Sequence, residues 1–365
     1  MNAREKNHIV VFGGANMEYI LKPVSELIDG GKNFVEIDEL FGGSGVNYSL
    51  RLLSCEQVVY PVLFLGDDAT GERIYSELKR FSSEENSIFF ERGSFFVPNL
   101  KSIRSVIIVD GHKRTILSED QNKENIFFEF AKKRVKDIDS VDSVIIGHIH
   151  NDRMQINKDS SKLTTKFIID HFKDRDILIY ANFGASQLEY GFSFWSEYIN
   201  SIDILQLNML EFKKFLGEDP ECSLYMLIKK IWDIDINAII TLDKFGAIGI
   251  LKDEKDAIFF ARPVSKIEGF IDSTGAGDAF CAGMVAYLGG KKEIEKDEFM
   301  VAMEYARTWA TYACRSYGGA NSCPNRYEIE SYHSKLIEDS KVVYYKDKEM
   351  RDILSLIDTL IEKDS

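Results

Sequence analysis

The decisive stretch of this sequence is DSTGAGDAFCAG, residues 272–283. The Gly275-Ala276-Gly277 turn opens a predicted helix, Asp278–Leu288, because glycines let the backbone turn sharply and leave its N–H groups uncovered. These groups point along the positive end of the helix dipole, which makes the turn a candidate anion site. Asp278 adds a carboxylate beside it. This pair suits phosphoryl transfer, since the amides stabilise the phosphoryl oxygens and the carboxylate accepts the proton of an attacking hydroxyl.

A plainer interpretation of the same residues is an ordinary helix start, where Asp and Gly are common anyway. Two other phosphate-binding motifs are excluded. The chain holds no GxxxxGK[ST] sequence and therefore no Walker loop. Phe280 stands where the third glycine of a dinucleotide-binding fingerprint belongs.

Outward from this turn, short runs rich in β-branched residues alternate with longer amphipathic runs. The predicted strands are Ile9–Phe12, Val58–Phe64, Ser105–Val109, Ser143–Ile146, Asp176–Tyr180, Ile202–Leu207, Ala238–Leu242 and Gly246–Leu251. The predicted helices are Asn47–Ser54, Thr70–Arg80, Met209–Leu216, Ser223–Trp232, Asp278–Leu288 and Phe299–Ser316. Several strands are apolar nearly throughout, which is typical of strands buried on both faces. The order predicts an α/β fold with a mostly parallel sheet covered by helices on both sides.

Two segments break this alternation, Glu18–Leu40 and Phe95–Leu117. Both resemble exposed strands joined by turns, and neither carries a long helical pattern. They predict either a small separate sheet over one edge of the main domain or plain surface hairpins.

The tail, Ser340–Ser365, ends in a helical pattern with an apolar face. That face consists of Met350, Ile353, Leu354, Ile357, Leu360 and Ile361. It packs either on the chain's own core or on a second copy in a homodimer.

The composition limits the classes of function. The 365 residues carry a formal net charge of −14, and such an acidic surface repels nucleic acid and anionic membranes. The five cysteines are odd in number and show no CxxC spacing, which favours a reducing cytoplasm over a disulfide framework or a structural zinc site. The longest uncharged apolar stretch, Ala279–Gly290, is too short to span a bilayer.

The run Asp272–Val285 resembles the C-terminal signature of the ribokinase-like (PfkB) carbohydrate kinases. The resemblance implies a three-layer α/β/α sandwich with a mostly parallel central sheet and a small β lid. Residues 1–330 would form the kinase domain, with lid segments at about 18–40 and 95–117, and residues 331–365 a C-terminal helical extension. It also implies that Asp278 is the catalytic base and that Gly275, Ala276 and Gly277 form the anion hole.

Two further motifs imply which residues bind the acceptor, the molecule that receives the phosphoryl group. Gly42-Gly43-Ser44-Gly45-Val46-Asn47 resembles the N-terminal signature of the family, although Ser44 stands where ribokinases carry Lys. Asn16-Met17-Glu18 resembles the family's Asn-x-Asp, with a longer acid. By this resemblance, the residues that bind the acceptor are Asn16, Glu18, Gly42, Gly43 and Asn47. The acidic Glu18 favours an acceptor without a phosphate group.

The nucleotide side is implied by three motifs. Asn208-Met209-Leu210-Glu211 resembles the family's NxxE motif, in which Glu211 would hold Mg²⁺ through water with support from Asn208. Thr241–Ala247 resembles a nucleotide-binding turn and implies contacts at Thr241 and Gly246, although Asp243 replaces its first glycine. Gly318–Pro324 looks like the adenine-side loop and implies a contact at Gly318.

In family members that depend on a monovalent cation, this loop and an Asp/Thr pair coordinate K⁺. The corresponding residues here are Asp272, Thr274 and Ser322. His148 and His150 lie at the end of a predicted strand where the family's substrate pocket is built. Histidines at such a place are more often structural, so the predicted site does not include them.

Together these motifs predict an ATP-dependent kinase that transfers the γ-phosphoryl group to a hydroxyl of a sugar or sugar-like small molecule. The predicted cofactors are ATP and Mg²⁺, with K⁺ as a further candidate. One alternative is a nucleoside kinase on the same scaffold, because ribose uses similar hydroxyl contacts. The other is a non-catalytic binding protein, against which the intact Gly-Ala-Gly-Asp argues.

Overall fold

The computed structural model describes residues 6–26, 28–83, 90–110, 113–119, 126–138, 140–155, 159–264, 266–321, 323–336 and 341–364. Ser322, a predicted cation ligand, lies outside these ranges, as do short parts of the two predicted lid segments.

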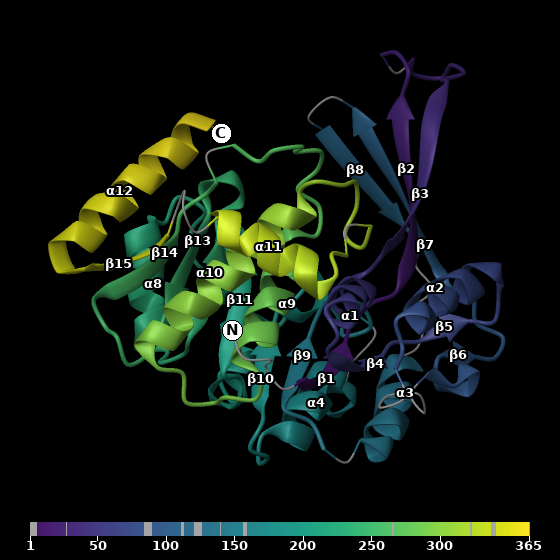
Figure 1. The fold of residues 1–365 in the computed structure, drawn as a ribbon, viewed down its shortest axis with the longest axis horizontal. Coiled ribbons are helices and arrows are strands. Elements are labelled where there is room, and N and C mark those ends of the chain that lie inside the picture. Colours follow the sequence, from purple (N-terminus) through teal and green to yellow (C-terminus); the bar gives the residue numbers. More distant parts are fainter. Residues whose placement is uncertain are drawn as a thin grey trace.

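A long mixed sheet forms the centre of the molecule (Figure 1). Its strands, in spatial order, are β4 (Val58–Val62), β1 (His8–Phe12), β9 (Ser143–Ile146), β10 (Leu178–Ala181), β11 (Ile204–Asn208), β12 (Ala238–Thr241), β13 (Ala247–Ile250), β14 (Ala257–Ala261) and β15 (Val342–Lys346). The six strands from β4 to β12 run parallel, and β13 to β15 continue antiparallel. The central strands are buried throughout, which confirms the mostly parallel sheet that the sequence predicts.

Two groups of helices cover the sheet and give the three-layer α/β/α architecture. The first group packs together as α1 (Ser44–Ser54), α9 (Ala276–Leu288), α10 (Lys296–Ala313) and α11 (Arg326–Leu336). The second comprises α3 (Ile126–Arg134), α4 (Thr164–Phe172), α5 (Ala185–Leu188), α6 (Gly191–Trp195), α7 (Met209–Leu216), α8 (Leu224–Asp233) and α12 (Asp347–Asp364). Gly283 lets α9 approach α10 closely, because a Cβ there would lie 2.7 Å from Ala306 Cα.

A separate four-stranded sheet stands away from the main sheet, with α1 near its foot (Figure 1). We call it the lid sheet; its order is β3 (Val35–Gly42), β2 (Asn16–Pro23), β7 (Ile103–Asp110) and β8 (Lys113–Ser118). Because β2 pairs with β7, the two irregular segments join in one sheet rather than form independent hairpins. The second segment enters this sheet only at Ile103, since β6 (Phe96–Val97) pairs with β5 (Leu65–Gly66), which precedes α2 (Ala69–Arg80).

The tail folds onto the chain's own core. Met350, Leu354 and Ile357 of α12 are buried in the main hydrophobic cluster, as the helical pattern predicts for packing within one chain, whereas Leu360 is 43% exposed. The tail also supplies β15, a strand that the sequence analysis does not anticipate. In the part of the chain that the structure describes, no helix is both long and apolar enough to cross a membrane.

Candidate active site

The Gly-Ala-Gly turn opens α9, as predicted, although the helix begins at Ala276 rather than Asp278. Gly275 precedes the helix with a φ of 75°, a conformation that glycine adopts without strain. The amide of Ala276 donates to the Ser273 carbonyl over 3.1 Å. Amides in the first turn of a helix have no acceptor within that helix, so those of Gly277 and Asp278 remain suited to an anion.

Asp278 is held by a residue of the N-terminal motif. Asn47 Nδ2 donates to Asp278 Oδ2 over 2.7 Å, which joins α1 to the start of α9 across 231 positions of sequence. Asn47 is only 6% exposed, and its Oδ1 atom is buried without a hydrogen-bond partner among the described residues. A buried acceptor of this kind calls for a donor, and a hydroxyl group of a ligand would supply one.

Gln206 holds the glycine turn from the side of the main sheet. Its Nε2 atom donates to the Gly277 carbonyl over 2.9 Å, while its Oε1 accepts from the Tyr180 hydroxyl over 2.7 Å. Gln206 lies two residues before Asn208 on β11, and Asn208 pairs with Thr241 on β12. The predicted nucleotide residues Asn208 and Thr241 therefore lie at adjacent strand ends next to the glycine turn.

Beyond β12 the chain turns through Asp243–Phe245 to Gly246, which has a φ of 98°. The Leu242 amide closes the turn by donating to the Gly246 carbonyl over 2.8 Å. Asp243 itself adopts a positive φ of 53°, so the turn keeps a left-handed residue where the family motif has glycine.

The loop after α10 lies against the glycine turn. A Cβ on Gly275 would come within 2.5 Å of Gly319 Cα, and one on Gly319 within 2.2 Å of Asn47 Nδ2. Arg51, which is fully buried, donates to the Gly319 carbonyl. The predicted contact residue Gly318 donates its amide to Asp272 Oδ2 over 3.2 Å.

The predicted metal ligands already bond within the protein. Asp272 Oδ1 accepts from the Thr274 hydroxyl over 2.8 Å, so this pair is together as predicted. Asn208 and Glu211 form a reciprocal cap at the start of α7, with bonds of 2.9 Å and 2.8 Å. No group of three or more His, Cys, Asp or Glu side chains within the described ranges is arranged to hold a metal ion. The side chains of Asp272, Thr274 and Glu211 offer oxygen atoms, the ligand type that a hard cation takes together with water or substrate oxygens.

The predicted acceptor residues gather where the lid sheet meets the main domain. Asn16 pairs with Gly42 across β2 and β3. The Asn16 Nδ2 atom donates to Ser105 Oγ over 2.9 Å, while its Oδ1 is buried without a partner in the described structure. The Glu18 carboxylate covers Gly42, since a Cβ there would lie 2.3 Å from it. Gly43 has a φ of 89°, and a Cβ there would meet the Gly14 carbonyl at 2.5 Å.

A small cavity of about 20 Å³ lies beside this region. It is lined by Gly13, Gly14, Ala15, Phe64, Ile103, Phe127, His148, Ile149, His150 and Asn151. The His148 amide donates to Ser44 Oγ over 3.0 Å, so the end of β9 is tied to the start of α1. The two histidines that the sequence analysis does not include therefore lie next to the strand that leads to Asn16.

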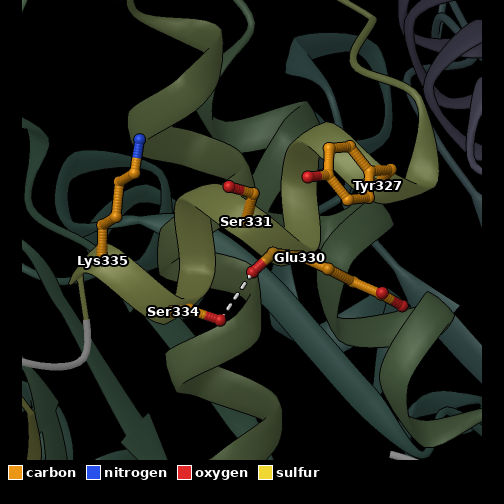
Figure 2. Close-up of a pocket in the computed structure, with 5 residues that line it drawn as sticks. All are labelled: Tyr327, Glu330, Ser331, Ser334 and Lys335. Carbon is orange, nitrogen blue, oxygen red and sulfur yellow. Dashed lines mark hydrogen bonds between the residues drawn. The ribbon is translucent and has the colours of Figure 1, made fainter.

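A larger and shallower hollow of about 580 Å³ runs along α11 (Figure 2). Its lining residues, Tyr327, Glu330, Ser331, Ser334 and Lys335, all come from this one helix. They include none of the residues gathered around Asp278. The larger hollow and the predicted site residues therefore do not coincide.

The sequence analysis misses four buried residues of this region: Tyr48, Arg51, Asn182 and Gln206. Their positions along the chain carry no local signal for the contacts that they make. Only a polar residue inside an otherwise apolar strand, as at Gln206, indicates that a buried side chain needs a partner.

A family model described as "pfkB family carbohydrate kinase" matches residues 92–326. The chain therefore belongs to the PfkB family of carbohydrate kinases.

Individual relatives fit this assignment. An ATP-dependent 6-phosphofructokinase of Thermoanaerobacterium thermosaccharolyticum is 24% identical over 80% of this chain and 84% of its own. Among solved structures, Arabidopsis thaliana ribokinase complexed with ribose and ATP has a TM-score of 0.63 and 18% identity, covering 90% of this chain and 99% of its own. A Burkholderia thailandensis nucleoside kinase in complex with inosine has a TM-score of 0.64 and 15% identity, covering 92% and 99%. These two structures share the fold.

Proposed function

We propose that this protein is an ATP-dependent kinase that phosphorylates a hydroxyl group of a sugar or sugar-like small molecule, with Asp278 as the base. The observation that carries the proposal is the bond between Asn47 and Asp278. It brings the acceptor motif, the carboxylate and the amides of the glycine turn to one place. Neither an ordinary helix cap nor a plain binding protein requires these three elements together.

In the proposed step, the acceptor oxygen forms a bond to the γ-phosphorus of ATP while the bond to the β,γ-bridging oxygen breaks and ADP leaves. Asp278 takes the proton of the acceptor hydroxyl and later returns it to solvent. The amides of Gly277 and Asp278, with Gly275 and Ala276 shaping the turn, would stabilise the negative charge on the phosphoryl oxygens. Gln206 keeps the turn in place through the Gly277 carbonyl.

Two buried oxygens without a hydrogen-bond partner among the described residues support a substrate that is rich in hydroxyl groups. Asn16 Oδ1 and Asn47 Oδ1 are buried and would each accept a hydrogen bond from a hydroxyl group of the ligand. The Glu18 carboxylate, which lies over Gly42, favours a neutral acceptor over one that carries a phosphate near this point. Sugars and nucleosides both meet these requirements, and relatives of both kinds share the fold.

Magnesium would accompany the nucleotide and neutralise charge on its phosphates. Glu211, with Asn208, would hold it through water, because Mg²⁺ usually keeps several waters and takes few carboxylates. The Asp272/Thr274 pair would offer oxygen ligands to a K⁺ ion close to Gly318. The lid sheet would close over the acceptor and exclude water, which otherwise competes as a phosphoryl acceptor.

A panel of D-ribose, D-fructose, fructose 6-phosphate, adenosine and inosine, assayed by ADP release with Mg²⁺ and with EDTA, tests this function. The Asp278→Asn variant should lose about 10²–10⁴-fold in kcat on the best acceptor while still binding ATP. Asp297→Asn, which changes an exposed acid in the first turn of α10, is the matched control and should retain activity. Near-normal turnover by Asp278→Asn, or full activity in EDTA, would contradict the proposal.

A further inference from the structure

A row of three polar side chains crosses the lid sheet, and two of them lie outside the predicted site. Asn16 Nδ2 donates to Ser105 Oγ over 2.9 Å, and the Ser105 hydroxyl donates to Ser118 Oγ over 3.0 Å. Ser105 of β7 pairs with Glu18 of β2 on one side and with Ser118 of β8 on the other. Paired residues share a face of a sheet, so this polar row lies on the face that carries Glu18.

The polar row gives each of its hydrogen bonds a direction. Ser105 is only 3% exposed, and its hydroxyl has a single proton, which goes to Ser118. Ser118 is exposed, so its own proton can go to solvent. Ser105 therefore serves Asn16 only as a hydrogen-bond acceptor, and such a partner takes the nitrogen of the Asn16 amide rather than its oxygen.

The bond to Ser105 leaves the Asn16 oxygen for another partner. Oδ1 is buried and has no hydrogen-bond partner among the described residues. Asn16 pairs with Gly42, where the predicted acceptor-binding motif begins, and with Ile103, which lines the smaller cavity. An amide oxygen only accepts hydrogen bonds, so the group that completes it must be a donor. A hydroxyl group of a substrate can donate, whereas a fluorine atom in its place cannot.

We propose that Ser105 is a positioning residue for recognition of the molecule that is phosphorylated. By accepting from the Asn16 nitrogen, it keeps the Asn16 oxygen available, so the protein selects a substrate with a hydroxyl group at this point. Without Ser105, the amide can rotate and offer its nitrogen, a donor that does not require a hydroxyl. This inference rests on the proposed function and narrows its substrate class to molecules with a second hydroxyl besides the one that faces Asp278.

The bond between Asn16 and Ser105 can be tested without any substrate. In ligand-free protein labelled with ¹⁵N at the asparagine side chains, the amide signals missing in Asn16→Asp assign Asn16. Ser105→Ala should shift these signals and speed their exchange with water, because the nitrogen loses its partner. Ser102→Ala is the matched control, since Ser102 is also buried but its hydroxyl bonds to the Gly66 backbone. It should leave the Asn16 signals in place.

Substrate selection is tested with analogues in which one hydroxyl at a time is replaced by fluorine. For adenosine these are 2′-deoxy-2′-fluoroadenosine and 3′-deoxy-3′-fluoroadenosine; for another best substrate of the panel, its own monofluoro analogues are used. The hydroxyl that receives the phosphoryl group is left intact. In the unmodified protein, fluorine at one position should lower kcat/KM by at least about tenfold, because the Asn16 oxygen is left without a donor.

Ser105→Ala should weaken this discrimination. The ratio of kcat/KM between the hydroxyl substrate and its fluoro analogue should fall by about 2- to 12-fold, which is the worth of one neutral hydrogen bond. The KM for ATP should stay within about twofold, since the polar row lies on the lid sheet. Ser105→Thr keeps the hydroxyl and should keep the ratio, and Ser102→Ala should also leave it unchanged.

The outcomes separate this inference from the proposed function. If folded Ser105→Ala leaves the ratio unchanged, Ser105 has no role in selection, whether or not the Asn16 signals move, and the proposed function stands. If Ser102→Ala lowers the ratio equally, the effect is a general loosening of the lid sheet and the inference is wrong. If no member of the panel is phosphorylated, or Asp278→Asn keeps near-normal turnover, the proposed function fails and this inference fails with it.

Discussion

Asp278 and Asn16 lie at two ends of one candidate site, but the molecule supports them differently. Asp278 lies in the first turn of α9, which packs against α1 and α10, and side chains from α1 and β11 hold its surroundings. Asn16 begins a strand of the lid sheet, whose own buried core consists of Ile20, Leu40 and Ile107. A core of three side chains provides little stability by itself.

Under the proposed function, this difference would separate the residues that carry out catalysis from those that recognise the acceptor. The proposed base and the proposed anion-binding amides are held by contacts within the protein, as a preorganised site requires. At the proposed acceptor end, Asn16 Oδ1 is buried without a hydrogen-bond partner among the described residues, so a ligand would complete this end. We therefore expect changes at the base end to affect kcat and changes at the lid end to affect recognition.

Among changes that leave the proposed base itself in place, the largest effect should come from Gly319→Ala, at the base end. The new Cβ would lie 2.2 Å from Asn47 Nδ2 and would push Asn47 away from Asp278. A displacement of about 1 Å can cost about 10²-fold in rate, so kcat should fall by about that factor with little change in the KM for the acceptor. Gly93→Ala is the control, because among the described residues no heavy atom other than those of its chain neighbours lies within 4 Å of the added Cβ. Unchanged kcat in folded Gly319→Ala would show that the base end tolerates movement.

Glu18→Ala should affect recognition instead. It removes a carboxylate that can accept two hydroxyl hydrogen bonds, and such bonds to charged groups are worth about 1.5–3 kcal/mol. Acceptor kcat/KM should fall by about 10- to 100-fold, while the KM for ATP should stay within about twofold. Glu36→Ala removes an exposed acid from the same sheet and should change neither. Steady-state kinetics with varied acceptor and varied ATP measure both quantities. If kcat/KM falls equally for the acceptor and for ATP, Glu18 does not act in acceptor recognition alone.

Glu211→Gln tests whether Glu211 holds a magnesium ion through water beside the nucleotide. Glutamine can still accept the Asn208 amide bond that caps α7, so the fold should persist. Loss of the negative charge should raise the Mg²⁺ concentration needed for half-maximal rate by about tenfold. Glu221→Gln alters an exposed acid nearby in sequence and should leave the Mg²⁺ dependence unchanged. An identical Mg²⁺ titration for Glu211→Gln and the unmodified protein would remove Glu211 from this role.

The smallest effect should come from removing the contact between the lid sheet and the loop at Gly318. Lys22 Nζ lies 3.5 Å from the centre of the Tyr317 ring and 2.6 Å from Asp38 Oδ2. Such a cation–π contact at a partly exposed site is worth about 0.5–1 kcal/mol. Lys22→Ala should therefore raise the acceptor KM by about 2- to 5-fold and speed amide hydrogen exchange in β2 and β3.

Lys32→Ala is the control for this contact, because Lys32 lies over Phe34 within the lid segment itself. It should leave the acceptor KM unchanged. If both lysine variants behave alike, the contact with Tyr317 does not hold the lid sheet against the main domain.

Much of the architecture could be predicted from sequence because the signals are local. The start of α9 follows from Gly275 and the residues next to it, and the cap of α7 from Asn208 and Glu211 three positions apart. The apolar strands of the main sheet follow from runs of adjacent β-branched residues. Each of these features depends on residues that are neighbours along the chain.

The rest depends on residues that only the fold brings together. Tyr48 and Asn182 are 134 positions apart, and Arg51 and Gly319 are 268 positions apart. The lid sheet likewise needs β2 to pair with β7, and β15 becomes a strand because β14 offers an open edge. The sequence by itself determined the family motifs and the candidate base. Only the tertiary structure decided what supports that base, because a buried polar group takes its partners from whichever elements the topology places beside it.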